Sequence, residues 1–174
     1  RILAALPPPQ RESVSLSDGA DRVVIESVSA PADLPPFDNS AMDGYAVRAA
    51  EVGQATTATP VRLRVRTKIP AGEHFAGELA PGECARLFTG SPLPRGADAV
   101  VMQEDTRTDA AHSAEILICD SVVSGEYVRR RGEDVQRGAM LVAAGAALTP
   151  GTIGLLAATG ITQVNVGRRP VVGL

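Results

Sequence analysis

The sequence predicts a mainly β chain with some α (α+β), built as a discontinuous mixed domain that carries an inserted all-β domain. Its 174 residues are 44% hydrophobic but only 3% aromatic, with no Trp. The core must therefore consist of Val, Leu, Ile and Ala, of which Val and Ile favour strands. The middle of the chain is a series of short strand-like runs separated by Gly and Pro. The two ends, residues 1–43 and 132–174, mix helix and strand signals instead.

The first end segment contains a helix signal, a strand signal and a connector. It opens with "RILAAL", which is typical of the end of an amphipathic helix. "DRVVIESVSA" at 21–30 is rich in β-branched residues and predicts a strand. "APADLPPF" at 30–37 contains three prolines, which cannot continue a strand ladder. It predicts a connector.

Residues 61–69 show the clearest period in the chain. "VRLRVRTKI" alternates between Val61, Leu63, Val65, Thr67 and Ile69 on one face and three arginines and a lysine on the other. This pattern predicts a half-buried strand with a basic outer face. A face of this kind commonly protects a strand at the edge of a sheet.

The rest of the middle segment reads as turns and short strands. "AGE", "AGE" and "PGE" follow one another at a spacing of five residues from position 71 and predict turns. "ECARLFT", "ADAVVMQEDT" and "AEILICD" then predict three more strands. Residues 44–131 are therefore expected to form the inserted all-β domain.

The last segment returns to mixed structure. "AMLVAAG" and "ITQVNVGR" predict strands, and between them Thr149, Pro150 and Gly160 mark the N-cap, first residue and end of a helix. The final "RRPVVGL" resembles the first strand of a further domain, so we expect the chain to be a piece of a longer protein. Segments 1–43 and 132–174 are each too short to bury a core alone, so they should pack on each other.

Charge and cysteine content exclude several classes of function. Seventeen basic against twenty acidic residues give a net charge of -3, which argues against a nucleic acid or a membrane as partner. The given sequence does not open with a signal-peptide pattern and contains no apolar run long enough to span a membrane, so we expect a cytoplasmic protein. Cys84 and Cys119 lack metal-ligand spacing and read as buried thiols. His74 and His112 stand in loops without ligand-spaced partners.

"PPFDNSAMDGYAV" at 35–47 is the first candidate site. It places Asp38 and Asp43 five residues apart among small and apolar neighbours. Residues of the types found at 39, 40 and 43 hydrogen-bond local backbone, and Gly44 permits a positive φ. A turn that leads into a strand explains these letters, and so does a pair of functional carboxylates.

Two further segments carry candidate site residues. In "LFTGSPLPRGADAVVMQED", Thr89 and Gly90 end a strand, where a hydroxyl and free backbone N–H groups could hold an anion. A Pro-Gly turn would explain the same residues. In "VRRRGEDVQRG", three arginines run into Glu133 and Asp134. They could bind phosphate and similar oxyanions or form a solvated charged face.

Taken together, four segments resemble the N-terminal half of the molybdopterin molybdotransferase family, the MoeA/gephyrin E-domain family. They are "PPFDNSAMDGYAV", "FTGSPLPRGADAVVMQED", "VRRRGEDVQRGAML" and "ALTPGTIGLLAATGI", in this order. The resemblance runs from about Val23 to the last residue. Upstream, "SDGADRVVIE" stands where relatives usually carry a longer helix and a Gly-Arg pair, so the start of the first domain does not follow the family pattern.

The resemblance implies a reaction and an architecture. Enzymes of this family insert molybdate into adenylylated molybdopterin and release AMP, with Mg²⁺ or another divalent cation assisting. They are elongated homodimers with a split first domain, an inserted second β domain and a third domain that carries the main pterin pocket. This chain would correspond to the first two domains, and it should be inactive alone. A molybdopterin adenylyltransferase is a further implied partner.

The resemblance also assigns roles to individual residues. The catalytic positions of the family fall on Asp43, Thr89 and Asp134. Substrate-binding positions fall on Asn39, Ser40, Gly90, Glu104, Arg131 and Glu133. Molybdate and phosphate are anions, so a divalent cation or a positioned proton must separate them from a carboxylate. We therefore expect Asp43 and Asp134 to bind the cation or to position an attacking oxygen, and Thr89 to hold an oxyanion.

Two other functions fit the same residues. The chain could be a non-catalytic dimerisation or protein-interaction module of the same family, which would tolerate loss of the Asp43 and Asp134 carboxylates. It could also be a free-standing anion-binding domain, provided that the basic strand at 62–68 faces a cleft.

Overall fold

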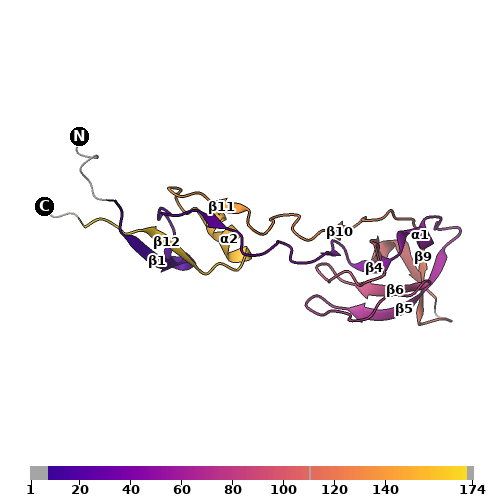
Figure 1. Ribbon diagram of the computed structural model, residues 1–174. Helices are drawn as coiled ribbons and strands as arrows, with labels where there is room; N and C mark the ends of the chain where they lie inside the picture. The colour runs from indigo at the N-terminus through magenta and orange to yellow at the C-terminus, as the bar shows by residue number, and fades with distance from the viewer. Residues whose placement is uncertain (1–7, 110, 172–174) are drawn as a thin grey trace. The chain divides into compact units, whose positions relative to one another are not determined.

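A computed structural model describes residues 8–109 and 111–171, and the fold is mainly β. The chain folds into two compact units, coloured from indigo to yellow along the sequence in Figure 1. The split unit joins the chain up to Pro36 with the chain from Gly132 onward, and the inserted unit is Phe37–Arg131. The helix signal in "RILAAL" lies outside the described residues.

The boundary between the units falls after Pro36, whereas the sequence places it after Asp43. Residues 37–43 belong with the inserted unit because β3 (Asn39–Ser40) pairs with β10 (Val128–Arg129) in that unit. The Ala41 N–H also donates to the Tyr127 carbonyl at 2.9 Å. These backbone bonds join the two ends of the inserted unit, a long-range pairing that no local pattern marks.

The inserted unit is built on one six-stranded sheet with the strand order β7-β4-β6-β5-β9-β8. Among the strands that the structure describes in this sheet, β5 and β6 pair in parallel and the other neighbours are antiparallel. Short helical turns interrupt the all-β pattern expected here, namely α1 (Ala49–Val52) and the 3₁₀ turn η3 (Gln103–Asp105). The strands are β4 (Gly44–Val47), β5 (Val61–Ile69), β6 (Glu83–Leu87), β7 (Ala99–Met102), β8 (Thr106–Thr108) and β9 (Glu115–Ile118).

Strand β5 confirms the alternation at 61–69 and corrects its expected position. Leu63 and Ile69 are buried, while the basic side chains between them are exposed. The strand lies between β6 and β9, so it is an interior strand and not an edge. The basic face therefore covers the middle of the sheet. Arg62 on this face pairs with Asp109 and Glu115 at 3.0 and 2.9 Å.

Gly44 is needed for close packing and not for an unusual φ, contrary to the expectation from the sequence. It lies in β4 between β6 and β7, and its φ is not positive. A Cβ at this position would stand 2.0 Å from the Val101 carbonyl oxygen. Real Cβ atoms do not approach backbone so closely, so no other residue fits without a shift of β7.

The described part of the split unit contains two strand pairs, the 3₁₀ turn η2 (Leu16–Asp18) and the helix α2. β1 (Arg11–Ser15) pairs with β12 (Gln163–Gly167), and β2 (Val28–Ser29) pairs with β11 (Met140–Val142). α2 (Pro150–Ala158) begins as predicted, with Thr149 Oγ1 accepting from Thr152 N at 3.2 Å. The core draws on both ends of the chain and consists of Leu16, Val24, Val142, Leu148, Leu156, Val164 and Val166.

Three predictions for this unit and for the cysteines are wrong. Residues 21–30 form isolated bridges at Val23 and Val24 and the short β2, because the chain turns between them. Residues 168–171 form no strand, and 172–174 lie outside the described residues. Cys84 is buried as expected, but Cys119 is half-exposed. In addition, β1 carries a single β-branched residue, and the sequence does not predict it.

Among the described residues, no helix is both long and apolar enough to cross a bilayer.

Candidate functional site

Asp43 and Thr89, 46 residues apart in the chain, meet at one corner of the inserted unit. Asp43 precedes β4 and Thr89 follows β6, and these neighbouring strands are antiparallel. Asp43 Oδ1 accepts two hydrogen bonds from Thr89, at 2.8 Å from the backbone N and 2.9 Å from Oγ1. Both side chains are exposed. The structure thus brings together two of the three residues to which the resemblance assigns a catalytic role.

Local hydrogen bonds hold the loop that carries Thr89. Ser91 Oγ donates to the Ile69 carbonyl at 2.8 Å and accepts from Phe88 N at 3.1 Å. Gly90 N donates to the Ser40 carbonyl at 2.8 Å, and Gly90 has a φ of 84°. The loop is therefore fixed to β5 on one side and to β3 on the other.

The backbone N–H groups of this loop do not form an open anion site. Thr89 N donates to Asp43, Gly90 N to Ser40 and Ser91 N to Phe88. The Thr89 hydroxyl also donates to Asp43. An oxyanion could be held by Thr89 only if these bonds were broken. In this structure Thr89 orients a carboxylate.

Asn39 and Ser40 hold the local backbone instead of facing solvent. Both are buried, with 6% and 0% of their surface exposed. Asn39 Nδ2 donates to the Phe37 carbonyl, and Ser40 Oγ bonds the backbone of Met42. In this structure these two side chains bond the backbone around them and shape the loop before Asp43, and little of their surface is open to a substrate.

The surroundings of Asp43 favour the ionised carboxylate. The two hydrogen bonds from Thr89, the backbone one first, lower the pKa of Asp43 below its ordinary value, and the positive charge of Arg86 adds to this effect. Asp43 Oδ2 accepts no hydrogen bond from the described residues. One carboxylate oxygen is therefore fixed and the other is available to a ligand.

These residues fit a divalent cation only in part. Within residues 8–109 and 111–171, no group of three His, Cys, Asp or Glu side chains is arranged to hold a metal ion. Mg²⁺ commonly takes one or two carboxylates and completes its shell with water and substrate oxygens. The free oxygen of Asp43 suits such a shared cation and not a site made by the protein alone.

Asp38, the other aspartate of the first candidate segment, is not paired with Asp43 but with two arginines. It accepts from Arg130 Nη1 at 2.9 Å and from Arg131 N at 2.7 Å. The backbone N–H of Arg131 is the larger cause of a lowered pKa at Asp38. Asp38 lies at the start of the inserted unit and its two partners lie at the end of it, so these bonds join the first and last residues of that unit.

Glu133 and Asp134 belong to the split unit, and both are exposed. They line a shallow pocket of about 440 Å³ together with apolar side chains that include Met140, Leu141 and Leu155. The Asp134 N–H donates to the Leu34 carbonyl at 2.9 Å, which anchors this turn to the connector before it. The third expected catalytic residue is therefore presented from a separate unit.

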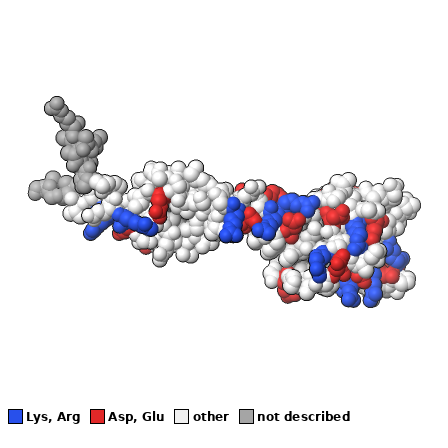
Figure 2. All heavy atoms as spheres, in the orientation of Figure 1, with Lys and Arg blue, Asp and Glu red and all other residues white. Residues whose placement is uncertain are grey.

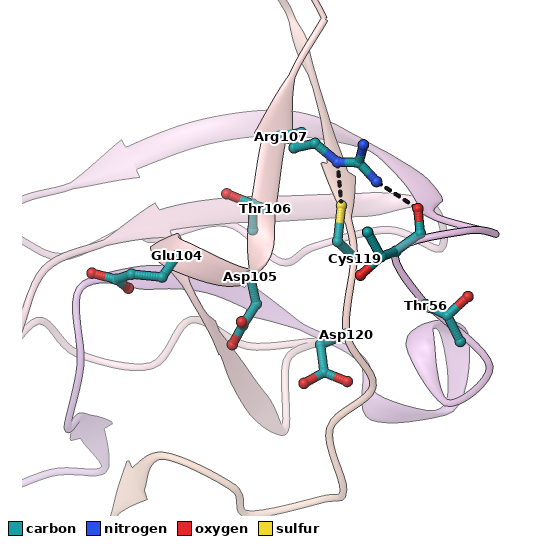
Figure 3. Close-up of a pocket in the computed structure, with 8 residues that line it drawn as sticks. Thr56, Glu104, Asp105, Thr106, Arg107, Cys119 and Asp120 are labelled. Carbon is teal, nitrogen blue, oxygen red and sulfur yellow. Dashed lines mark hydrogen bonds between the residues drawn. The ribbon is translucent and has the colours of Figure 1, made fainter.

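Glu104 lines a pocket of about 480 Å³ on the inserted unit (Figure 3). Asp105 and Asp120 line the same pocket, and burial, followed by the charges of Asp120 and Glu104, raises the pKa of Asp105. Arg107 Nε donates to Cys119 Sγ at 3.1 Å. The acidic lining makes this pocket unfavourable for an anionic substrate.

Charges of both signs are interspersed on the face of the inserted unit drawn in Figure 2. Arg62 pairs with Asp109, and Arg130 pairs with Asp38. This distribution agrees with the near balance of basic and acidic residues in the sequence.

Comparison with known proteins gives a consistent result. The model of the family described as "MoeA N-terminal region (domain I and II)" matches residues 1–160. Curated relatives include proteins named molybdopterin molybdenumtransferase. The one from Bacillus subtilis is 38% identical over 95% of this chain, and those from a Nostoc species and Haemophilus influenzae are 40% and 38% identical over 94% and 100%. The chain spans 39%, 37% and 42% of the lengths of these relatives.

Solved structures agree with the sequence relatives. Two crystal structures of molybdopterin biosynthesis MoeA protein from Pyrococcus horikoshii superpose with TM-scores of 0.83 and 0.85. They are 40% and 35% identical to this chain and cover 93% and 92% of it, while the chain covers 41% and 42% of theirs.

Proposed function

Because the chain belongs to the family of the MoeA N-terminal region (domains I and II), we propose that it is part of an enzyme of molybdenum cofactor biosynthesis. The whole enzyme would insert molybdate into adenylylated molybdopterin and release AMP. The names of the relatives support this reaction class. The observation that carries a role for this chain is Asp43, one oxygen of which is held by two donors of Thr89 while the other accepts no hydrogen bond from the described residues.

The geometry suggests how Asp43 would act. Its ionised carboxylate would repel molybdate and phosphate unless a cation or a proton stood between them. A divalent cation bound here would neutralise charge on the substrate oxygens. Asp43 would contribute Oδ2 to that cation or accept a proton from an attacking oxygen, and Thr89 would keep the carboxylate from rotating.

Asp134 would supply a second carboxylate of the same kind. It stands on a shallow pocket that is lined by both polar and apolar side chains, among them Glu133 and Leu141. Arg131, Glu133, Gly90 and Glu104 remain proposed substrate contacts. Glu104, like Asp43, would require a cation between its carboxylate and an anionic substrate. We also propose a cytoplasmic homodimer that receives its substrate from a molybdopterin adenylyltransferase.

The test is Asp43→Asn and Asp134→Asn in the whole enzyme. Asn keeps the size of the side chain and its ability to form a turn, so the change removes charge and little else. If each carboxylate acts on the cation or the reacting oxygen, turnover should fall about 30- to 1,000-fold, as expected for loss of one preorganised electrostatic group.

Asp109→Asn is the matched control. Asp109 also lies in the inserted unit, where hydrogen bonds from His112, from the Ala111 N–H and from Arg62 lower its pKa to about 2. It has no proposed role in the reaction, so its variant should turn over normally. Near wild-type turnover of Asp43→Asn and Asp134→Asn would reject the catalytic proposal and favour a non-catalytic interaction module. Melting temperature and turnover should be measured on the same samples.

A further inference from the structure

The Arg86 side chain bonds three segments of the chain around Asp43. It lies in β6 and is half-buried. Its Nη1 donates to the Gly44 carbonyl at 2.9 Å and to the Leu87 carbonyl at 3.1 Å, and its Nη2 donates to Gln103 Oε1. Gly44 directly follows Asp43, and Leu87 stands two residues before Thr89.

The third segment returns to Asp43 by its backbone. Gln103 follows β7, and its N–H donates to the Asp43 carbonyl at 2.9 Å. A single guanidinium thus bonds the residue after Asp43, the strand end before Thr89 and the residue that holds the Asp43 backbone. A planar group with five fixed donors can bridge acceptors in this way, whereas an ammonium on a flexible stem cannot hold the same geometry.

The positive charge of Arg86 is not neutralised by an ion pair within the part of the chain that the structure describes. Its guanidinium carbon lies 4.9 Å from the centre of the Phe88 ring and 5.3 Å from that of Tyr45. The aromatic contacts limit the movement of the side chain and leave its charge in place. That charge acts on the Asp43 carboxylate, the pKa of which it helps to lower.

We propose that Arg86 is a positioning residue that holds together the first residue of β4, the last residue of β6 and the start of η3. In this arrangement one carboxylate oxygen of Asp43 stays bonded to Thr89, and the other oxygen stays available to a ligand. The inference rests on the proposed function for its catalytic meaning. The structural effect, in which Arg86 holds the segment that carries Thr89, is independent of the proposed function. Arg86 itself contacts no reacting group, and no sequence motif singles it out.

The test uses Arg86→Met, Arg86→Lys and a control, Arg66→Met, in the whole enzyme. Met removes the charge and all donors, and Lys keeps the charge but loses the fork. Arg66 is an exposed arginine on the neighbouring strand β5, outside the proposed site. Two quantities are measured, namely hydrogen exchange of the segment 88–91 by mass spectrometry and the pH dependence of kcat/KM.

Arg86→Met should raise the exchange rate of segment 88–91 by about tenfold or more, since the strand end before Thr89 loses its tie. It should also move the acidic limb of the pH profile of kcat/KM to higher pH. Without the positive charge of the guanidinium, the pKa of Asp43 should rise. Arg86→Lys should raise the exchange rate with a smaller shift of the limb. Arg66→Met should leave both quantities unchanged.

The two readouts separate the inference from the proposed function. Unchanged exchange and an unmoved pH limb in both Arg86 variants would overturn the positioning role, and if Arg86→Met does not fold, Arg86→Lys alone decides. Faster exchange with full turnover by Asp43→Asn would support the positioning of Thr89 and reject catalysis by Asp43. Faster exchange, a moved limb and a slow Asp43→Asn enzyme would support both.

Discussion

Thr89 carries both hydrogen bonds that orient the Asp43 carboxylate. Thr89→Val keeps the backbone N–H bond and the side-chain shape but removes the hydroxyl, so the pKa of Asp43 should rise toward its ordinary value. A carboxylate with a lowered pKa is charged above that pKa and loses its charge as the pH falls through it. The variant should therefore lose activity at a higher pH than the wild type, with kcat/KM at neutral pH reduced about tenfold.

Thr89→Ser is the matched control for that experiment because it retains the hydroxyl. Its pH profile should coincide with that of the wild type. A Thr89→Val profile of wild-type shape would show that the hydroxyl bond does not influence the group that limits activity at low pH.

Gly44 gives a prediction about stability. A methyl group at this position would meet the Val101 carbonyl at 2.0 Å, so Gly44→Ala should destabilise the inserted unit by about 3 kcal/mol or more. Gly154→Ala is a control of opposite sign, since Gly154 lies within α2 and has open space around its missing Cβ. That change should stabilise the helix by about 1 kcal/mol. Urea unfolding of both variants measures the two effects.

Residue identities predict some contacts of the site and not others. The sequence singles out Asp43 and Thr89 separately, and their direct bond depends on the pairing of β4 with β6, which local patterns do not specify. Asn39 and Ser40 are expected at a substrate, yet buried polar side chains of this kind serve the backbone around them. The sequence does not indicate a role for Arg86, because an arginine in a strand is ordinarily exposed and nothing near it predicts that its side chain bonds several segments.

At the scale of single elements, prediction succeeded where a short-range rule determines the outcome. The alternation in β5 and the cap, proline and glycine of α2 act within a few residues. β1 has little strand propensity of its own and exists because β12 supplies its partners across the unit. β5 proved interior for a related reason: strand order depends on pairings between residues far apart in the sequence.

The cap of α2 can be tested directly. Thr149 Oγ1 accepts from Thr152 N and lies 2.9 Å from Thr152 Oγ1. Thr149→Ala should destabilise the split unit by about 1 kcal/mol, whereas Thr149→Ser should be close to neutral. Circular dichroism during thermal unfolding gives the comparison. Equal melting curves for the Ala and wild-type chains would show that the cap does not contribute.

For the whole molecule, the length of the relatives determines what this chain can be expected to do. It covers about two fifths of them. If the pterin pocket belongs to the remaining part, the 174-residue chain should fold but neither cleave adenylylated molybdopterin nor retain molybdenum. Measuring AMP release and bound molybdenum tests this, with the whole enzyme as the positive control. Turnover by the chain alone would contradict a site shared with other domains.

The junction between the units shows how one fold can be hosted inside another. In the split unit Gly132 N donates to the Pro35 carbonyl, and in the inserted unit Arg131 N donates to Asp38. In each unit, a hydrogen bond therefore joins the two chain segments that lie at the boundary with the other unit. Folding of the split unit requires the two ends of the inserted segment Phe37–Arg131 to lie close together. Because the inserted unit already holds these ends together, the loss of chain entropy on closing this long connection is little more than that of a tight hairpin loop. A gene segment encoding such an inserted unit could be gained, exchanged or deleted in evolution without rebuilding the fold around it.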